Sequence, residues 1–560
     1  MFDTFLTALK RFQSDKRGTA AFIFAVTAIP TISLVGAAID YNRAVKVQNE
    51  LQNALDAGAL AASHLAYLDD ASVSQIEAVI TDIVQGHLQG TYGVHSLQVT
   101  AGIDLDDALV DVFADIKVDT YLLGIMGVDE ITVRVDSAVQ ADTTPTEIAL
   151  VLDNTGSMAR QMRTLRTAAQ NFVNVVTEEG RQSQVSVSLV PYVASVNIGN
   201  ARAHEAYLDI AGQSQYHASI LEDAVLGQLD SCGPQEAAQG QSNNHQSLFG
   251  IRAAFAENPY SYTVDADCNI RNPSTISHWD LFRATDSRWK GCVEARPAPY
   301  DVLDTPPNPR EPDTMWVPYF WADDTELQNG SHDNHWIDDT PFLEDSDMAS
   351  SIEGRALSVL KYSAGNGVRI DENPPETDGP NKSCGDPILP LTNDYDELSD
   401  RIQAMIHWNS GGTQTVQGAV WGWRTLSPSP PFTEGAPYGE ADKFMVIMTD
   451  GVNFLTNSNN PALESSYSAY GNLALGRMGD SRNDARRHID RRMIEVCHNA
   501  KAEGITVFTV TFKLRDGETR LVWDQCASGE DKSYHVDSAD ELVSAFVEVA
   551  RSIQDLRLVR

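Results

Sequence analysis

The stretch Ile148-Ala149-Leu150-Val151-Leu152-Asp153-Asn154-Thr155-Gly156-Ser157 decides the fold, because five apolar residues run directly into a polar turn. A continuous apolar run is typical of a parallel strand that is buried on both faces of a sheet. A second such run, Phe444-Met445-Val446-Ile447-Met448, leads into Thr449-Asp450-Gly451. In an open α/β sheet the ligand site lies beyond the carboxyl ends of such strands. We therefore expect both polar clusters to meet at one edge of the sheet.

The side chains in these clusters indicate a metal site. Asp153 is followed by hydroxyl groups at Thr155 and Ser157, and Asp450 follows the second run. They supply only hard oxygen ligands, which suit Mg²⁺ or Mn²⁺, and no thiolate is offered to zinc. Asp, Thr, Ser and Gly also populate ordinary turns and helix N-caps, so the first cluster alone is compatible with a purely structural role.

The full pattern resembles the metal-ion-dependent adhesion site of von Willebrand factor type A domains, in which Asp-x-Ser-x-Ser precedes a distant Thr and a distant Asp. Asp153, Thr155 and Ser157 match the first part, with Thr155 in place of the usual serine, while Thr413 and Asp450 match the rest. The resemblance implies that these five residues hold Mg²⁺ or Mn²⁺. It also implies that hydroxyl oxygens bind the metal directly, that the aspartates often act through water, and that a partner carboxylate completes the shell.

An enzymatic interpretation has less support. An aspartate after a strand is also the nucleophile of haloacid-dehalogenase-type phosphatases, but those enzymes need a second aspartate two residues later as general acid. Thr155 occupies that position and cannot transfer a proton in that way. A metal-dependent hydrolase would need a general base, and we expect His488 and His498 to lie on a helix surface. The prediction is a protein without catalytic activity.

Helix and strand patterns alternate through the second half of the chain. Strand patterns occupy residues 185–190 and 505–512, and helical spacing follows Ser157 and recurs at 485–503. A capping box at Ser538 and Glu541 begins a further helix. The alternation predicts an α/β fold with a doubly wound, Rossmann-like parallel sheet. Together with the site, this resembles a von Willebrand factor A domain over residues 143–557.

A large insertion is predicted inside this domain, at about residues 200–384. Helix and strand periodicity fades there, while Pro, Asn, Asp and Trp cluster. Loops at the ligand end of a rigid sheet usually decide specificity. The tryptophans of the insertion either anchor a partner or form a small local core, and the local core is favoured. They are Trp289, Trp316, Trp321 and Trp336.

The N-terminal region predicts a membrane anchor. Residues 1–17 form a basic cytoplasmic tail, and 22 residues from Gly18 to Ile39 carry no charge. As a helix they would span about 33 Å, enough to cross a bilayer, so we expect a transmembrane helix at 18–40 with the bulk of the chain outside. A cleaved signal peptide is the alternative, since Val35-Gly36-Ala37 is an acceptable cleavage context. Residues 41–142 predict a helical stalk and a small α+β module.

Charge and cysteine content limit the compartment and the partners. The net charge of −37 would repel nucleic acid and anionic lipid surfaces. All six cysteines follow the predicted anchor, as expected in an oxidising compartment. Disulfide candidates are Cys232, Cys268, Cys292, Cys384, Cys497 and Cys526. A bond between Cys497 and Cys526 is favoured, the pairing of the other four stays open, and buried free thiols are the alternative.

The N-terminus extends the resemblance to TadG-like proteins of Flp-type (tight-adherence) pilus assembly. Arg17-Gly18-Thr19-Ala20-Ala21-Phe22-Ile23-Phe24-Ala25, then Pro30 and Asp40-Tyr41, match their anchor. Further matching segments are Trp289-Lys290-Gly291-Cys292, Leu389-Pro390-Leu391-Thr392, Trp421-Gly422-Trp423-Arg424 and Cys526-Ala527-Ser528. Related pseudopilins carry a Glu where this chain has Ile23, which favours a permanent anchor over cleavage after Gly18.

The resemblance implies a non-enzymatic, single-pass inner-membrane protein with a cytoplasmic N-terminus and a periplasmic metal-binding domain. Its partners would be pilus assembly proteins or pilins that offer an acidic side chain to the metal. Two alternatives remain open, a metal-dependent surface adhesin outside any pilus system and a metal-dependent hydrolase.

Overall fold

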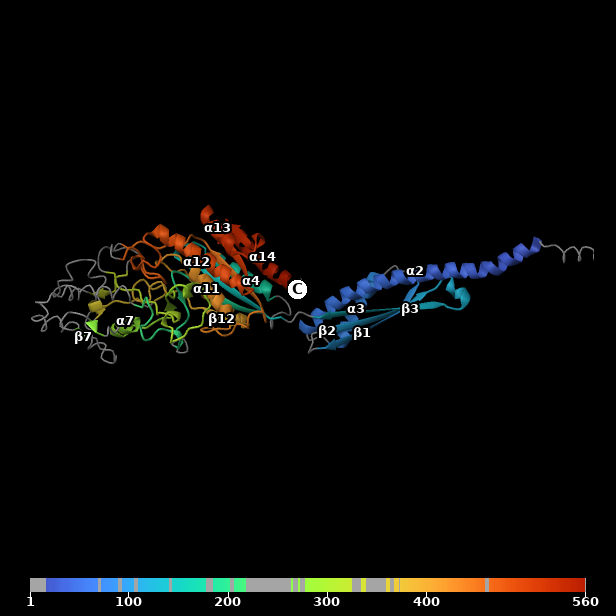
Figure 1. The fold of residues 1–560 in the computed structure, drawn as a ribbon, viewed down its shortest axis with the longest axis horizontal. Coiled ribbons are helices and arrows are strands. Elements are labelled where there is room, and N and C mark those ends of the chain that lie inside the picture. Colours follow the sequence, from blue (N-terminus) through green and yellow to red (C-terminus); the bar gives the residue numbers. More distant parts are fainter. Residues whose placement is uncertain are drawn as a thin grey trace, which may run out of the picture. The chain divides into compact units, whose positions relative to one another are not determined.

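The computed structural model describes residues 17–68, 72–88, 93–104, 109–140, 144–177, 185–201, 206–217, 263–264, 270–271, 277–324, 334–338, 359–362, 367–371, 373–458 and 463–558. The chain divides into two compact units, Met1–Thr143 and Thr144–Arg560, called unit 1 and unit 2 from here on. Figure 1 shows the elements of each unit.

Unit 1 packs two helices against a three-stranded antiparallel sheet. The helices are α2 (Arg17–Leu68) and α3 (Val73–Leu88), and the strands, in the order β1-β2-β3, are β1 (Val94–Asp104), β2 (Leu109–Asp119) and β3 (Glu130–Gln140). One stripe of α2 joins α3 and the inner face of the sheet in a single core that includes Val47, Leu51, Leu55, Ile80 and Val112. Helix α3 and the three strands lie where the sequence predicts the small α+β module.

Helix α2 is continuous over 52 residues, with Pro30 inside it. The described side chains leave out residues 17–22, 25, 29 and 62–68 of this helix. Among the side chains that are described, no helix is both long enough and apolar enough to cross a bilayer.

Unit 2 is built on a six-stranded sheet with the order β12-β5-β4-β13-β14-β15. Its strands are β4 (Thr146–Asp153), β5 (Val185–Tyr192), β12 (Leu389–Thr392), β13 (Asp442–Thr449), β14 (Thr506–Phe512) and β15 (Ser533–Val536). Five strands are parallel, and β12 pairs antiparallel with β5. The predicted parallel sheet is therefore confirmed for five strands and wrong for the edge strand β12. Strand β12 starts beside the carboxyl ends of the other strands, where the insertion returns, and so must run in the opposite direction.

Helices cover both faces of this sheet, as the alternating pattern predicts. Along β4, Ile148, Leu150 and Leu152 face one layer, while Ala149 and Val151 face the other. The first layer contains α4 (Met162–Val176), α10 (Tyr395–Ala404) and α14 (Ala539–Leu558). The second contains α11 (Thr415–Leu426), α12 (Arg482–Ala502) and α13 (Gly517–Cys526). The result is an α/β sandwich of three layers (Figure 1).

The insertion packs as a loop-rich extension of the second layer. Its described parts hold the helix α7 (His278–Ala284) and short pairs such as β6 (Val196–Asn197) with β9 (Cys292–Val293). Further short strands are β7 (Thr263–Val264), β8 (Ile270–Arg271), β10 (Ile337–Asp338) and β11 (Gly367–Val368). The four tryptophans of the insertion are at most 8% exposed, and three of them join the same core as α11. They therefore form a core, as favoured from the sequence, and are not exposed for a partner.

The pairing of the cysteines is partly as expected. Cys497 and Cys526 form a disulfide bond between α12 and α13, and Cys292 pairs with Cys384. Cys232 and Cys268 lie outside the described residues.

Helix α11 lies so close to the sheet that one glycine has no room for a side chain. A Cβ at Gly422 would lie 2.4 Å from Cγ2 of Val151 and 3.0 Å from Sδ of Met445. We expect Gly422→Ala to lower the free energy of unfolding by about 1–3 kcal/mol, because overpacking pushes the helix from the sheet. Gly517→Ala is the matched control in α13, where a Cβ would meet nothing within 4 Å. Thermal unfolding of both variants tests this, and an equal melting temperature for the two would contradict it.

Candidate functional site

The two polar clusters meet at the carboxyl edge of the unit 2 sheet. Strands β4 and β13 are parallel neighbours with Met448 opposite Leu152, so the turn after each strand begins at the same level. Asp153 is the last residue of β4, and Asp450 follows the end of β13. The register of two buried strands therefore places two residues that are 297 positions apart in sequence at one point.

A chain of hydrogen bonds connects four of the predicted ligands. Thr155 donates to Oδ1 of Asp153 from both its backbone N–H (2.9 Å) and its hydroxyl group (2.6 Å). The hydroxyl oxygens of Thr155 and Ser157 are 2.9 Å apart, and Ser157 donates to Oδ1 of Asp450 at 2.6 Å. The side chains of Asp153, Thr155, Ser157 and Asp450 therefore converge on one small volume.

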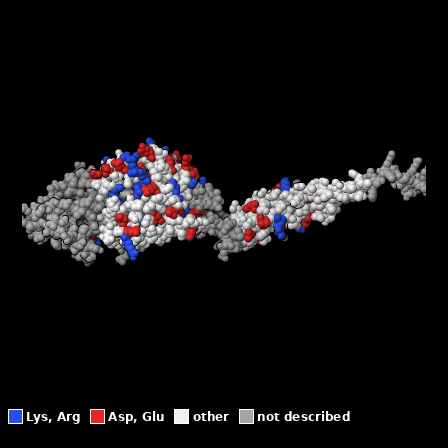
Figure 2. Space-filling view, viewed as in Figure 1, with Lys and Arg blue, Asp and Glu red and all other residues white. Residues whose placement is uncertain are grey.

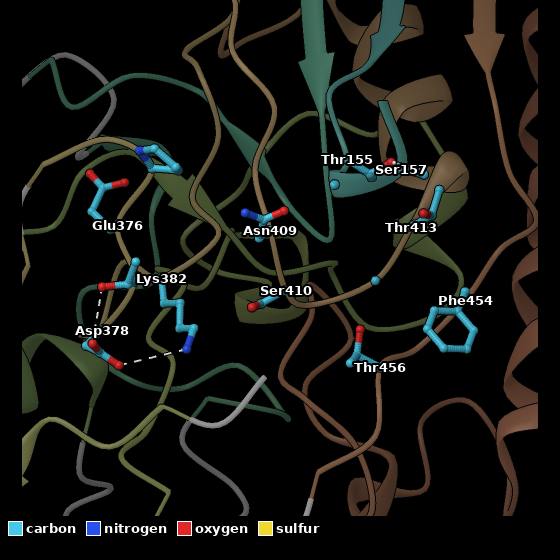
Figure 3. Close-up of a pocket in the computed structure, with 14 residues that line it drawn as sticks. Thr155, Ser157, Glu376, Asp378, Lys382, Asn409, Ser410, Thr413, Phe454 and Thr456 are labelled. Atoms are coloured by element: carbon cyan, nitrogen blue, oxygen red, sulfur yellow. Dashed lines mark hydrogen bonds and ion pairs between the residues drawn. The ribbon is translucent and has the colours of Figure 1, made fainter. Parts of the chain in front are cut away.

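Thr413, the fifth predicted ligand, lies on a different loop and lines a pocket together with Thr155 and Ser157. Gly411 and Gly412 have φ values of +80° and +99°, which favour glycine, and a Cβ at Gly412 would lie 2.0 Å from the carbonyl oxygen of Phe454. Two backbone hydrogen bonds between Thr413 and Phe454, of 2.8 and 3.1 Å, then fix the loop. Thr413, Thr155 and Ser157 line one wall of the pocket (Figure 3).

The two carboxylates of the site disfavour each other's charge. Burial raises the pKa of Asp153, although hydrogen bonds from Thr155 and Thr449 act in the opposite direction. Burial and the charge of Asp153 raise the pKa of Asp450 to about 7. A bound cation would offset this repulsion, because a nearby positive charge favours the ionised carboxylates.

The pocket next to these residues has a volume of about 750 Å³ and is open to solvent. Its opposite wall comes from the last part of the predicted insertion and includes Glu376, Asp378 and Lys382 (Figure 3). Lys382 lies 3.9 Å from Asp378, and Lys290 pairs with Glu376 at 2.5 Å. The wall facing the candidate metal site thus carries both signs of charge, each with a partner.

Two residues that support the site were not identified from the sequence. Thr449 is fully buried and donates to the second oxygen of Asp153 at 2.8 Å. In the sequence, its position at the end of the apolar run 444–448 and directly before Asp450 would have indicated that it lies at the site. Asp386 accepts from the side chain of Asn154 (3.2 Å) and the backbone N–H of Ile406 (3.2 Å). Only the tertiary structure brings Asp386 there.

The histidines considered as general bases lie elsewhere. His488 and His498 are on α12, and none of the residues lining the pocket is a histidine. His488 is half-buried, and burial together with Arg492 lowers its pKa. Among the described residues, no group of three or more His, Cys, Asp or Glu is placed to hold a metal ion. The candidate site differs from such groups, because it combines two carboxylates with three hydroxyl groups.

Solved structures of pilus proteins are similar to this chain at low identity. They include the pilus adhesin SpaC from Lactobacillus rhamnosus GG (11% identity, TM-score 0.30, 82% of this chain and 33% of SpaC covered). The vWF domain of the type V pili tip protein Mfa5 from Porphyromonas gingivalis matches with 10% identity and a TM-score of 0.30 (74% and 96% covered). The pilus adhesin RrgA from Streptococcus pneumoniae matches with 10% identity and a TM-score of 0.29 (81% and 49% covered). The matched part therefore spans about a third of the length of SpaC.

No curated protein matches this chain. Residues 18–66 match the family described as Flp pilus-assembly TadE/G-like. This range covers the segment from Gly18 to Asp40-Tyr41, where the sequence predicts an anchor, and most of the remainder of α2. The likeness to TadG-like Flp pilus-assembly proteins, expected from the N-terminal sequence, is thus confirmed over residues 18–66.

Proposed function

We propose that this chain is a non-enzymatic, membrane-anchored component of Flp-type pilus assembly, and that unit 2 is a von Willebrand factor A domain with a metal-ion-dependent adhesion site. The observation that carries the proposal is the hydrogen-bonded chain from Asp153 through Thr155 and Ser157 to Asp450. Apolar packing alone does not require two distant parts of the sequence to bring four oxygen-bearing side chains into one chain of hydrogen bonds beside a pocket that Thr155 and Ser157 line. A shared ligand gives a reason for this arrangement.

The donor set fits Mg²⁺ or Mn²⁺. Thr155, Ser157 and Thr413 would supply hydroxyl oxygens, and Asp153 and Asp450 would supply carboxylate oxygens. Hard divalent cations prefer such ligands, and Mg²⁺ usually keeps water or a partner group in its shell. The raised pKa of each carboxyl group supports the same fit, because a bound cation would favour the ionised form of both groups. When bound, the cation would supply an electrophilic position for an acidic side chain of a pilin or assembly protein.

The family likeness at residues 18–66 supports the pilus role. For the membrane anchor, support comes from the described apolar side chains in the first part of α2. Seven of them are between 51% and 73% exposed, namely Ile23, Phe24, Val26, Ile32, Leu34, Val35 and Ile39. Apolar side chains on all sides of a helix fit a lipid surrounding better than water. The two disulfides of unit 2 favour an oxidising compartment, which fits a periplasmic location.

Calorimetric titration of Mg²⁺ into the full chain in detergent tests the metal site. We expect saturable binding at one site, weakened about 100-fold or more in Asp450→Asn, which keeps the side-chain shape but removes one charge. Asp396→Asn is the matched control, because Asp396 is exposed on α10. Helix α10 begins near the amino end of β5, away from the carboxyl edge of the sheet that carries the site. Equal binding by the two variants, or no binding by the folded wild-type chain, would contradict the metal site.

The pilus role needs a second measurement in cells. A strain that makes Asp450→Asn in place of the wild-type chain should assemble few Flp-type pili at an unchanged level of the protein. Normal piliation with a chain that no longer binds Mg²⁺ would contradict a role of the metal site in pilus assembly.

A further inference from the structure

The charge-free turn between β2 and β3 in unit 1 is held beside α2 and exposes apolar side chains. Residues 120–128, Thr-Tyr-Leu-Leu-Gly-Ile-Met-Gly-Val, contain no charge. Tyr121 and Met126 are each 61% exposed and Val128 is 45% exposed. The short helix η1 (Leu123–Met126) forms the centre of this turn.

The turn is fastened to one level of α2. The carboxylate of Asp40, itself only 2% exposed, accepts from the backbone N–H groups of Tyr121, Leu122 and Leu123 at 3.0, 2.9 and 2.8 Å. One turn earlier on the helix, Gly36 lies against Leu122, so that a Cβ there would be 2.5 Å from the Leu122 Cβ. Figure 1 shows the turn against α2, with the helix continuing past it toward residue 17.

The exposure of the apolar side chains of helix α2 changes at Asp40, the residue to which the turn is attached. After Asp40 its apolar residues are buried along one stripe, from Ala44 and Val47 to Ala59. Before Asp40 its described apolar side chains are exposed in several directions, as at Ile32, Leu34 and Val35, which follow one another at about 100° per residue. On the face seen in Figure 2, the end of unit 1 that is formed by α2 before Asp40 is almost free of charged residues. The apolar turn thus lies where the buried, one-sided part of the helix gives way to the exposed apolar part.

We propose that the 120–128 turn is a second membrane contact, which inserts Tyr121 and Met126 into the boundary between headgroups and acyl chains of a phospholipid bilayer. The inference rests on the proposed membrane anchoring. Continuity with the charge-free part of α2 selects lipid as the occupant, because a bilayer that surrounds the helix up to Asp40 also reaches the turn tied to Asp40. An amphipathic tyrosine fits this depth. The Arg43 guanidinium, 4.3 Å above the Tyr121 ring, is placed on the water side, where lipid phosphates lie. Anchor and turn together would fix the orientation of unit 1 on the membrane.

Tryptophan quenching by lipids with brominated acyl chains tests the proposal in the full chain, reconstituted in phosphatidylcholine vesicles. All nine native tryptophans lie in unit 2, between positions 279 and 523, and give a common background. Three single variants add one tryptophan each: Phe24→Trp in the anchor, Tyr121→Trp in the turn and Phe113→Trp as the matched control. Phe113 is 49% exposed on the outer face of β2, so all three are conservative changes at exposed positions.

We expect the fluorescence added by Tyr121→Trp to fall about twofold in brominated vesicles, and that added by Phe113→Trp to stay nearly unchanged. Quenching of Phe24→Trp without quenching of Tyr121→Trp would overturn this inference and leave the anchor in place. That outcome includes the case in which a second copy or another protein covers the turn. Absence of quenching for both, with release of the chain from vesicles by alkaline washing, would overturn the anchor and the turn contact together.

Discussion

Lys443→Met is expected to lower the free energy of unfolding of unit 2 by about 3–5 kcal/mol, because it leaves a buried carboxylate without its cation. Lys443 and Glu147 are register partners on β13 and β4 and are 3% and 5% exposed. The Lys443 ammonium group donates to Glu147 and to the carbonyl oxygen of Leu426 at 2.8 Å. Glu147 also accepts from the backbone N–H of Ala436 at 2.7 Å. The pair thus joins the amino ends of the two strands that carry the site to the loop after α11.

A double-mutant cycle measured by denaturant unfolding separates the pair from its surroundings. The double variant Lys443→Met/Glu147→Leu should recover most of the loss, because apolar replacements of a buried ion pair are often close to neutral. Arg487→Met is the control, since the Arg487–Asp484 pair on α12 is 66% and 44% exposed and should contribute at most about 1 kcal/mol. A double variant as unstable as Lys443→Met would contradict the explanation by an unpaired charge.

Removing the Cys292–Cys384 disulfide should cost about 4 kcal/mol of unfolding free energy, because the bond closes a loop with a sequence separation of 92 residues. Both cysteines are fully buried in a cluster with Tyr319, Trp321 and Tyr467. The bond holds the segment that forms the wall of the pocket opposite the candidate metal site. Cys292→Ala/Cys384→Ala should therefore also speed amide hydrogen exchange at residues 375–386, in addition to shifting the denaturant midpoint.

The second disulfide is the matched control for this prediction. Cys497 and Cys526 are separated by only 29 residues, so their removal should cost about 1 kcal/mol less in the chain-entropy description. It should leave exchange at residues 375–386 unchanged, because α12 and α13 do not line the pocket. The reverse order of stability, or equal exchange in the two double variants, would contradict the assignment of the Cys292–Cys384 bond to the pocket wall.

Local sequence determined the elements that carry the site. The apolar runs 148–152 and 444–448 predict buried parallel strands, and the structure forms β4 and β13 there. Helix α12 ends as predicted before Gly504, whose φ is +85°. Such features are readable because burial on both faces, helix periodicity and helix ends each depend on nearby residues.

Other local predictions were incomplete for the same reason. The spacing of Leu398, Ile402, Met405 and Ile406 predicts a helix that includes all four residues. Helix α10 instead ends at Ala404, and Met405 joins the core from the loop that follows. Helix α11 was not predicted after Thr413. All of its residues are buried, so it lacks the polar face by which an amphipathic helix is recognised.

For this protein, the sequence by itself indicated the α/β class and the favoured Cys497–Cys526 pairing, and its resemblance to von Willebrand factor A domains indicated the five oxygen-bearing residues of the candidate site. The class follows from apolar runs and helical spacing, which depend on nearby residues, and the two cysteines flank one strand. The tertiary structure alone decided the reversed edge strand, the support of Asp153 by Thr449, the pairing of Cys292 with Cys384 and the attachment of the 120–128 turn to Asp40. These depend on contacts between residues far apart in the chain, which only the packing of strands, helices and loops brings within hydrogen-bonding or bonding distance.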